Sequence, residues 1–347
     1  MHAGWRTAVR KLSIGLVLLL VCGEIAVRLW DGARGGTGSL YDYVVPAGSR
    51  FKMRAGVSVL VPERYGDVRY RINRAGYRDD DPRPGRRRIV VLGDSVSFGL
   101  GVQQEEIWPS LLERRLRREG LQPDAVENLA VWAYNTADEA DALREDGLPL
   151  RPELVILQFY MNDFSIAPPP APGAPQPAPT LGQRLTALKN RLLFSSALYR
   201  RLHQASMGLA YVLFHDLRRR RYPDTLNDAE PRGQSAMLRA TPDDADVAAF
   251  REIRQIRDLA RGRGAGFLLV LSPDETQLFS DRFDGINQRV RAFCRREGIP
   301  LVDPLPVYRA SPDRLALYHD GVHYSPTGHA LLARLVFDEL AARGLIR

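Results

Sequence analysis

The chain has 347 residues, 45% of them hydrophobic, which is enough for one large α/β domain with accessory segments. Its formal net charge of +8 comes mostly from arginines spread over predicted helices, without zinc-finger spacing or a heptad repeat after a basic region, so we expect no nucleic-acid partner. The two cysteines, Cys22 and Cys294, are distant from each other and from any histidine cluster, which argues against a disulfide framework and against a metal site.

The first predicted element is an apolar helix over about residues 12–30, preceded by three basic residues. About 20 apolar residues span a bilayer, and a positive flank before the span predicts a cytoplasmic N-terminus with the rest of the chain exported. Glu24 and Arg28 share one helical face and can pair near the far interface. We therefore expect residues 1–30 to form an uncleaved single-pass anchor in the inner membrane; a cleaved signal peptide and a buried soluble helix are the alternatives.

Residues 31–87 are rich in glycine, arginine and tyrosine and contain short alternating segments such as GVSVLV and DVRYRIN. Alternation of apolar and polar residues is typical of strands with one buried face. We expect a linker followed by a small β lead-in to the main domain.

From Arg88 onward, strand and helix patterns alternate. Strands are predicted at residues 88–94, 125–131, 153–160, 266–273 and 300–305, and helices at 105–120, 136–146, 244–264, 286–298 and 325–344. Continuous apolar strands separated by helices predict a parallel sheet covered on both faces. Residues 88–347 are therefore expected to form a three-layer α/β/α sandwich with a parallel, flavodoxin-like sheet, and the site should lie at the carboxyl ends of the strands.

An insertion at about residues 165–235 interrupts this alternation. Its proline-rich part, residues 167–180, is expected to be extended or disordered. Residues 181–222 then predict one or two basic amphipathic helices. These helices could pack on the domain, or they could lie on the membrane surface or cover the site.

Polar residues follow three strand positions. GDS at residues 93–95 ends the first core strand, MND at residues 161–163 follows the third, and DGVH at residues 320–323 precedes the last helix. Because carboxyl ends of parallel strands meet at one sheet edge, these three segments are expected to lie together.

The residue types at this edge predict nucleophilic catalysis. A serine hydroxyl such as that of Ser95 is a weak nucleophile until a base takes its proton. His323 is the natural base, and Asp320 would hold its imidazole in the correct tautomer. Ser325 and Pro326 have the pattern of an N-cap and a first helical residue, so a rigid helix start should follow the turn.

This constellation resembles the SGNH (GDSL) hydrolase family of esterases and lipases, over roughly residues 88–345 without the insertion. GDSVSFG at residues 93–99 is similar to the family's first block, and NLAVWAYNT at residues 128–136 to its second. Asn162-Asp163 is similar to the third block, and D-x-x-H at residues 320–323 to the fifth. The resemblance implies an α/β/α hydrolase with a serine-histidine-aspartate triad of Ser95, His323 and Asp320.

The resemblance also implies an oxyanion hole formed by the backbone N–H groups of Ser95 and Ala133 and the side-chain amide of Asn162. The family has glycine where this chain has Ala133. Alanine keeps the N–H and costs little unless the site requires a positive φ. Its methyl group reaches the pocket floor, and Trp132 beside it is expected to narrow the acyl pocket.

Other polar residues near these motifs predict structural roles. Asp94 is expected to brace its turn and Asp163 to tether a loop, and His329 lies within the last predicted helix. Asp274 follows the fourth core strand, but nothing around it indicates chemistry.

The resemblance implies a serine esterase that hydrolyses carboxylic esters through an acyl-enzyme and needs no cofactor or metal. With the domain on the periplasmic or outer side of the membrane, O-acyl groups on exported glycans are plausible substrates. An O-acyltransferase acting on an extracytoplasmic polysaccharide and a non-catalytic membrane-tethered scaffold are the alternatives. The acyl chain length, the alcohol and the oligomeric state stay open.

Overall fold

The computed structural model describes residues 2–33, 39–48, 50–63, 66–84, 87–161, 163, 184–185, 188–189, 191–192, 195–211, 243–281 and 284–347. The chain divides into two compact units. The smaller comprises Met1–Tyr43, Val59–Pro62 and Pro170–Arg221, and the larger comprises Val44–Ser58, Glu63–Pro169 and Tyr222–Arg347. The predicted proline-rich segment, residues 167–180, lies outside the described residues, as does much of the rest of the insertion.

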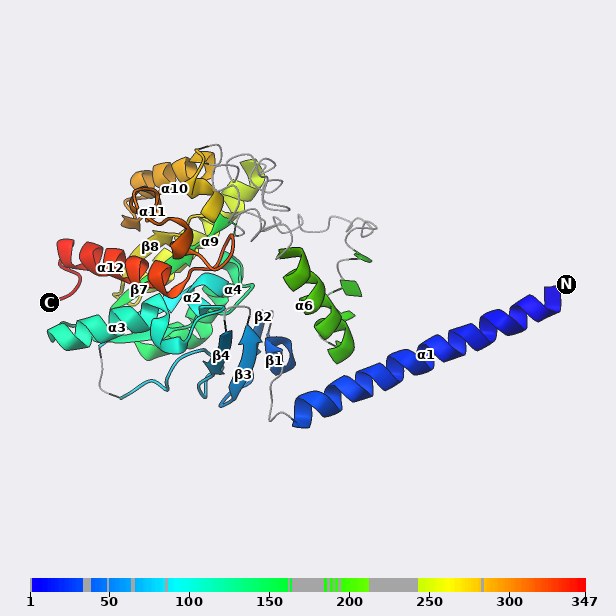
Figure 1. Ribbon diagram of the computed structural model, residues 1–347. Coiled ribbons are helices and arrows are strands. Elements are labelled where there is room, and N and C mark those ends of the chain that lie inside the picture. The colour runs from blue at the N-terminus through cyan, green and yellow to red at the C-terminus, as the bar shows by residue number, and fades with distance from the viewer. Residues whose placement is uncertain are drawn as a thin grey trace, which may run out of the picture. The chain divides into compact units, whose positions relative to one another are not determined.

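The smaller unit contains α1 (His2–Ala33), the 3-10 turn η1 (Leu40–Tyr43) and α6 (Ala197–Tyr211) (Figure 1). Within α1, the 21 residues Arg10–Trp30 have a mean hydropathy of 2.2 and are not buried. This helix is long and apolar enough to cross a membrane or to serve as a signal sequence. Arg28 donates a hydrogen bond of 2.7 Å to Glu24, so the pair predicted on this helix is present.

The larger unit is built on a five-stranded sheet. Its strands are β5 (Arg88–Leu92), β6 (Ala125–Asn128), β7 (Leu154–Phe159), β8 (Gly266–Leu271) and β9 (Leu301–Val302). Their order is β6-β5-β7-β8-β9, and every pair is parallel. Numbered within the sheet this is 2-1-3-4-5, the flavodoxin-like order, so the predicted fold class is confirmed.

Helices cover both faces of this sheet. They are α2 (Ser95–Phe98), α3 (Trp108–Glu119), α4 (Thr136–Ala142), α9 (Asp243–Arg261), α10 (Asp284–Glu297), α11 (Leu305–Arg309) and α12 (Pro326–Ala342), with short turns η2 (Gln104–Glu106), η3 (Leu143–Gly147), η4 (Leu148–Leu150), η8 (Glu275–Leu278) and η9 (Leu315–Leu317). On one face α3 and α12 pack together over the apolar side chains of β5, β7 and β8. On the other, α4 packs on α9, and Phe250 of α9 stacks on Phe293 of α10 with ring centroids 4.1 Å apart.

The predicted strands at residues 125–131 and 300–305 are longer than the observed ones. β6 ends at Asn128 because the Asn128 side chain accepts the N–H of Ala130 and turns the chain out of the sheet. β9 has only two residues, since prolines stand on both sides of it and lack the N–H that a ladder requires. Both shortened strands keep their predicted places in the sheet.

Strands also precede the main sheet, as expected for a β lead-in. β1 (Val44–Ala47) pairs antiparallel with β2 (Arg50–Met53). β3 (Ser58–Glu63) and β4 (Gly66–Arg71) follow along the chain. The boundary predicted between this region and residues 88–347 stays a prediction.

Candidate active site

The turn after β5 presents Ser95 as the first residue of α2. Asp94 is the N-cap, and its carboxylate accepts the N–H of Val96 at 2.9 Å. Gly93 occupies a position with no space for a side chain: a Cβ there would lie 2.7 Å from the Gln158 amide oxygen and 2.9 Å from the Ser97 hydroxyl. The Gly-Asp-Ser sequence therefore matches what this tight strand-to-helix turn requires.

A buried polar network holds α2 in place through Ser97. The Ser97 hydroxyl donates to the Gln158 side chain at 3.0 Å and accepts the indole N–H of Trp108 at 3.0 Å. The side chain of Asn128 donates to the Ser97 carbonyl at 2.9 Å. Because these bonds are shielded from water, they fix the orientation of the helix that begins at Ser95.

Asp320 and His323 lie in a turn that backbone hydrogen bonds close. Tyr318 and Tyr324 form an isolated antiparallel bridge, and the N–H of His319 donates to the His323 carbonyl at 2.8 Å. Ser325 then caps α12 by accepting the N–H of Gly328 at 3.2 Å, as the sequence predicts. The turn is thus fixed at its base and continues directly into a helix.

The structure brings Ser95, His323 and Asp320 into one hydrogen-bonded chain. The His323 Nε2 atom lies 3.0 Å from the Ser95 hydroxyl, and Nδ1 lies 2.8 Å from the Asp320 carboxylate. The other Asp320 oxygen accepts two backbone N–H groups, from Val322 at 2.8 Å and from His323 at 2.7 Å. With Nδ1 protonated toward Asp320, Nε2 is an acceptor aimed at the serine hydroxyl.

The surrounding charges favour the ionised forms of both His323 and Asp320. Burial alone would lower the pKa of His323, but the charge and hydrogen bond of Asp320, followed by the charges of Asp94 and Glu63, raise it above its ordinary value. Burial would raise the pKa of Asp320, but the His323 ring and the backbone donors hold that pKa below its ordinary value. The imidazolium that forms when His323 takes a proton is therefore stabilised in place.

The structure describes two of the three residues predicted for the oxyanion hole, Ser95 and Ala133. Ser95 begins α2, so its N–H has no acceptor within the helix. Ala133 is exposed and has φ +63°, the left-handed conformation in which glycine is the favoured residue. Asn162 lies outside the described residues, between Met161 and Asp163. Trp132, which precedes Ala133, is buried, and its ring centroid lies 5.2 Å from that of Phe51.

A second carboxylate near His323 comes from the β lead-in and carries no sequence signal. The Tyr70 hydroxyl donates to Glu63 at 2.7 Å and accepts the N–H of Gly101 at 3.0 Å. Gly101 lies in the loop after α2, and a Cβ on it would lie 3.3 Å from the ring of His319. The lead-in therefore contacts the loop that follows α2, and this loop in turn lies against His319.

Arg78 is another residue that sequence patterns did not reveal. It is fully buried, and its guanidinium donates to the carbonyls of Phe98 at 2.9 Å, of Val102 at 2.6 Å and of Gly99. The cation also lies 4.2 Å from the Tyr70 ring centroid. Burial lowers the pKa of Arg78 to about 10. Arg78 thus fastens the loop that leaves α2 by its backbone.

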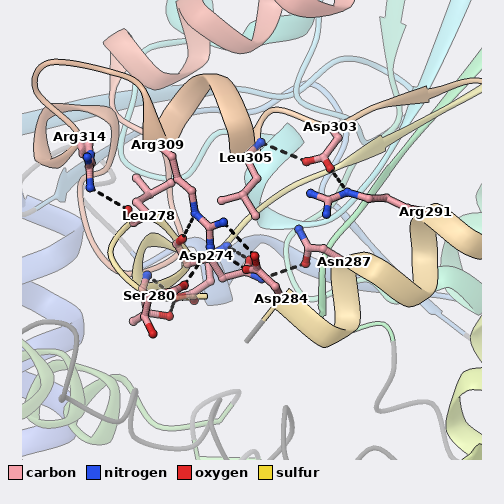
Figure 2. Close-up of polar contacts among 12 residues, drawn as sticks. Asp274, Leu278, Ser280, Asp284, Asn287, Arg291, Asp303, Leu305, Arg309 and Arg314 are labelled. Atoms are coloured by element: carbon pink, nitrogen blue, oxygen red, sulfur yellow. Dashed lines mark hydrogen bonds and ion pairs between the residues drawn. The ribbon is translucent and has the colours of Figure 1, made fainter. Parts of the chain in front are cut away.

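The turn carrying Asp320 and His323 is also held from the side of β8. The N–H of Glu275 donates to the Gly321 carbonyl at 3.0 Å, and the Tyr318 hydroxyl donates to the Pro273 carbonyl at 2.7 Å. Figure 2 shows how η8 is braced in turn: Arg309 donates to the Gln277 and Ser280 carbonyls and forms a two-pronged ion pair with Asp284, and Arg314 donates to the Leu278 carbonyl.

Asp94, Glu139 and Asp163 form a buried acidic group beside the nucleophile turn. Burial, together with the charges of Asp163 and Asp94, raises the pKa of Glu139 well above its ordinary value. Burial and Asp94 do the same to the pKa of Asp163. Asp163 accepts the N–H of Tyr160 at 3.0 Å, so it tethers its loop as predicted. Among the described residues, no group of acidic, histidine or cysteine side chains could hold a metal ion.

The remaining polar residues singled out in the sequence are structural. His329 is buried and accepts the N–H of Trp108 at 3.3 Å, and burial lowers its pKa to about 3. Asp274 is buried, caps η8 through Thr276 and accepts the hydroxyl of Tyr160 at 2.9 Å.

The larger unit is thus an α/β/α sandwich with a serine, a histidine and an aspartate joined at one sheet edge, an arrangement that serves hydrolases. The model of the GDSL-like lipase/acylhydrolase family matches residues 91–331. The chain therefore belongs to this family, and the resemblance to SGNH (GDSL) hydrolases that its motifs carry is confirmed.

Solved structures of several acylhydrolases are similar to this chain. One is a lipase/acylhydrolase from Enterococcus faecalis, with 17% identity, a TM-score of 0.43 and coverage of 74% of this chain and 96% of the other. Another is the psychrotrophic esterase EstA from a Pseudoalteromonas species, with 14% identity, a TM-score of 0.41 and coverage of 74% and 97%. No curated protein matches the chain.

Proposed function

We propose that this acylhydrolase is a serine esterase that uses Ser95 as nucleophile, His323 as general base and Asp320 as the group that orients His323. The observation that carries the proposal is the continuous hydrogen-bonded chain from the Ser95 hydroxyl through the imidazole to the Asp320 carboxylate. Family membership supports acyl hydrolysis as the general chemistry.

In the first half-reaction, the Ser95 oxygen attacks the ester carbonyl carbon while its proton moves to His323 Nε2. The tetrahedral oxyanion would receive hydrogen bonds from the N–H groups of Ser95 and Ala133 and from the Asn162 amide. The carbon–oxygen bond to the alcohol then breaks, and the alcohol leaves with the proton from His323. An acyl group on Ser95 remains.

In the second half-reaction, His323 takes a proton from water, and the resulting hydroxide attacks the acyl carbon. The bond to Ser95 breaks, the proton returns to the serine oxygen, and a carboxylic acid is released. The chain's own residues supply every proton transfer in this sequence.

We further propose that α1 anchors the enzyme in the inner membrane with its N-terminus in the cytoplasm. Basic residues precede the apolar segment Arg10–Trp30, and positive flanks stay on the cytoplasmic side. The larger unit would then face the periplasm or the outside, where acylated glycans are available as ester substrates.

The test is hydrolysis of p-nitrophenyl esters of increasing chain length by full-length protein in detergent. We expect Ser95→Ala to lower turnover by about a thousandfold or more. Ser110→Ala, a half-buried serine on α3, serves as the matched control and should keep full turnover. A fluorophosphonate probe should label the native protein and the control but not Ser95→Ala. Folded native protein that neither turns over any ester nor reacts with the probe would leave the scaffold alternative standing.

The same assay identifies the molecule that accepts the acyl group from Ser95. Water gives an esterase, whereas a sugar hydroxyl gives an O-acyltransferase with an identical first half-reaction. If added polysaccharide accelerates release of p-nitrophenol and becomes acylated, the transferase alternative replaces the esterase.

A further inference from the structure

The start of α6 is capped by a carboxylate from the anchor helix. Glu24 of α1 accepts the backbone N–H of Ala197 at 3.0 Å and that of Leu198 at 2.9 Å, and it also accepts the Ser196 hydroxyl at 2.9 Å. The first N–H groups of a helix have no partner within it, and an N-cap normally comes from the residue just before. Here Ser196 accepts the N–H of Tyr199 at 3.0 Å in the usual way, and Glu24, more than 170 residues earlier in the chain, caps the first two N–H groups of the helix.

Two neighbours of Glu24 strengthen this junction. Arg28 donates both to Glu24 and, at 3.0 Å, to the Ser195 carbonyl. Gly23 lets the two segments approach closely, since a Cβ there would lie 3.0 Å from the Leu198 side chain. The contact is therefore specific in charge and in shape.

The position of Glu24 along α1 sets where α6 begins. Glu24 precedes Trp30, the last residue of the apolar segment, by six residues, which corresponds to about 9 Å along a helix axis. In a bilayer whose hydrocarbon core is about 30 Å thick, that depth lies in the outer half of the core, about 6 Å from its midplane. If α1 spans the membrane with Trp30 at the outer edge of the core, the first turn of α6 lies within the outer leaflet.

The face of α6 that meets α1 continues as an exposed apolar surface. Leu202 and Leu209 follow Leu198 at helical spacing and are 60% and 61% exposed, as much as Leu18 of the apolar segment at 58%. Between them, the Ser206 hydroxyl donates a hydrogen bond to the His203 carbonyl, so its donor is satisfied within the helix. On the described helices of the larger unit, by contrast, leucines are buried or half-buried.

The residues just before α6 have the composition of a membrane-surface segment. Leu185 and Leu188 are 57% and 52% exposed, and the basic residues Lys189 and Arg191 beside them are exposed as well. Exposed leucines alternating with basic residues suit the boundary between acyl chains and anionic headgroups.

We propose that α6 is a second membrane-contacting element, which Glu24 and Arg28 dock on the outer half of the anchor so that Leu202 and Leu209 contact lipid of the outer leaflet. The occupant of this face is the bilayer itself, because the face is continuous with the contact to α1. The inference rests on the membrane anchor proposed above. It assigns a role to the insertion that the hydrolase chemistry does not require.

The experiment measures lipid contact at single labelled positions in full-length protein. The protein is reconstituted in vesicles of phosphatidylethanolamine and phosphatidylglycerol, with Cys22→Ser as background, since Cys294 is buried and protected from labelling. Leu202→Cys and Leu209→Cys carry the fluorophore NBD, and lipids with spin labels at successive depths of the acyl chain quench it. Leu18→Cys reports the span, and Val307→Cys, an exposed apolar position on α11, is the matched control.

We expect quenching at Leu202 and Leu209 comparable with that at Leu18, and none at Val307. Glu24→Ala should reduce quenching at both α6 positions without changing it at Leu18, whereas Glu24→Gln, which keeps an acceptor oxygen, should restore much of it. Unquenched α6 positions beside a quenched Leu18 would overturn the proposal while leaving the anchor intact. If NBD at Leu202 becomes more shielded as the protein-to-lipid ratio rises but does not respond to the quencher, a second copy of the chain covers the face. That result would also overturn the proposal. An unquenched Leu18 would remove the anchor itself.

Discussion

Ala133 is an alanine at a position where the backbone conformation favours glycine. Its φ of +63° places an L-residue in the left-handed region, at a cost of about 1–2 kcal/mol. The residue is exposed, and alanine keeps the backbone N–H that the proposed oxyanion hole uses. The cost is therefore one of conformation and not of lost chemistry.

We expect Ala133→Gly to raise the free energy of unfolding by no more than about 1 kcal/mol, because relief of strain is partly offset by the greater freedom of glycine in the unfolded chain. Ester hydrolysis should change by less than about threefold, since the N–H donor is kept. Urea unfolding and kcat/KM measure the two effects. A large gain in hydrolysis of long-chain esters would show instead that the methyl group limits the acyl pocket.

Glu63 illustrates a residue that acts on the site through charge. Its carboxylate is among the groups that raise the pKa of His323, and only neutral His323 can accept the serine proton. Activity should therefore fall as pH drops through the raised pKa.

Glu63→Gln removes a negative charge and so should lower the pKa of His323, which moves the acidic limb of the kcat/KM profile to lower pH. Glutamine can still accept the Tyr70 hydroxyl, so the local structure should persist. The same shift should appear in the imidazole titration by NMR. Glu153→Gln, at the opposite end of the sheet and ion-paired with exposed Arg87, is the control and should leave the profile unchanged. A profile that stays in place in Glu63→Gln would contradict this coupling.

At the scale of elements, the β lead-in and the nucleophile helix depend on each other. Arg78 satisfies the carbonyls of Phe98, Gly99 and Val102, where the chain leaves α2. Gly99 has no room for a side chain, since a Cβ on it would lie 2.1 Å from Ile107. The loop is thus closely confined and needs a donor that reaches three carbonyls at once, which the planar guanidinium provides.

We expect Arg78→Met to lower the free energy of unfolding by about 2–4 kcal/mol, because buried carbonyls lose their partners. Arg74→Met, four residues earlier on the surface, removes a charge from an exposed pair with Asp81 and should change it by less than about 0.5 kcal/mol. Urea unfolding followed by tryptophan fluorescence compares the two. Equal effects would mean that the carbonyl contacts of Arg78 contribute nothing of their own.

For the whole molecule, sequence patterns predict the sheet and its order well because each core strand is a continuous apolar run between helices. The proximity of Ser95, Asp320 and His323 was predictable because they occur in short motifs at strand ends and helix starts. Strand ends were less accurate: the strand expected to reach residue 131 stops at Asn128, whose side chain competes for a backbone N–H.

Other features depend on contacts that no local pattern encodes. Arg78 binds carbonyl groups, which every residue carries, so its role leaves no motif. The positive φ of Ala133 is set by the surrounding turn. The sequence alone does not show it, because the family's glycine is replaced by alanine at this position. In the sequence, Glu24 is a charged residue within an apolar helix. Its contacts with the N–H groups of Ala197 and Leu198 join segments far apart in the chain, so no local pattern predicts them.

The distance along the chain between nucleophile and base has a consequence for biosynthesis. Ser95 and His323 are 228 positions apart, and the turn that holds His323 is fixed by α12, which packs on α3 from the first part of the domain. A ribosome therefore finishes the nucleophile turn long before it makes the base. Under the proposed mechanism, chains that terminate before His323 carry the serine without its base, and we expect such fragments not to cleave esters.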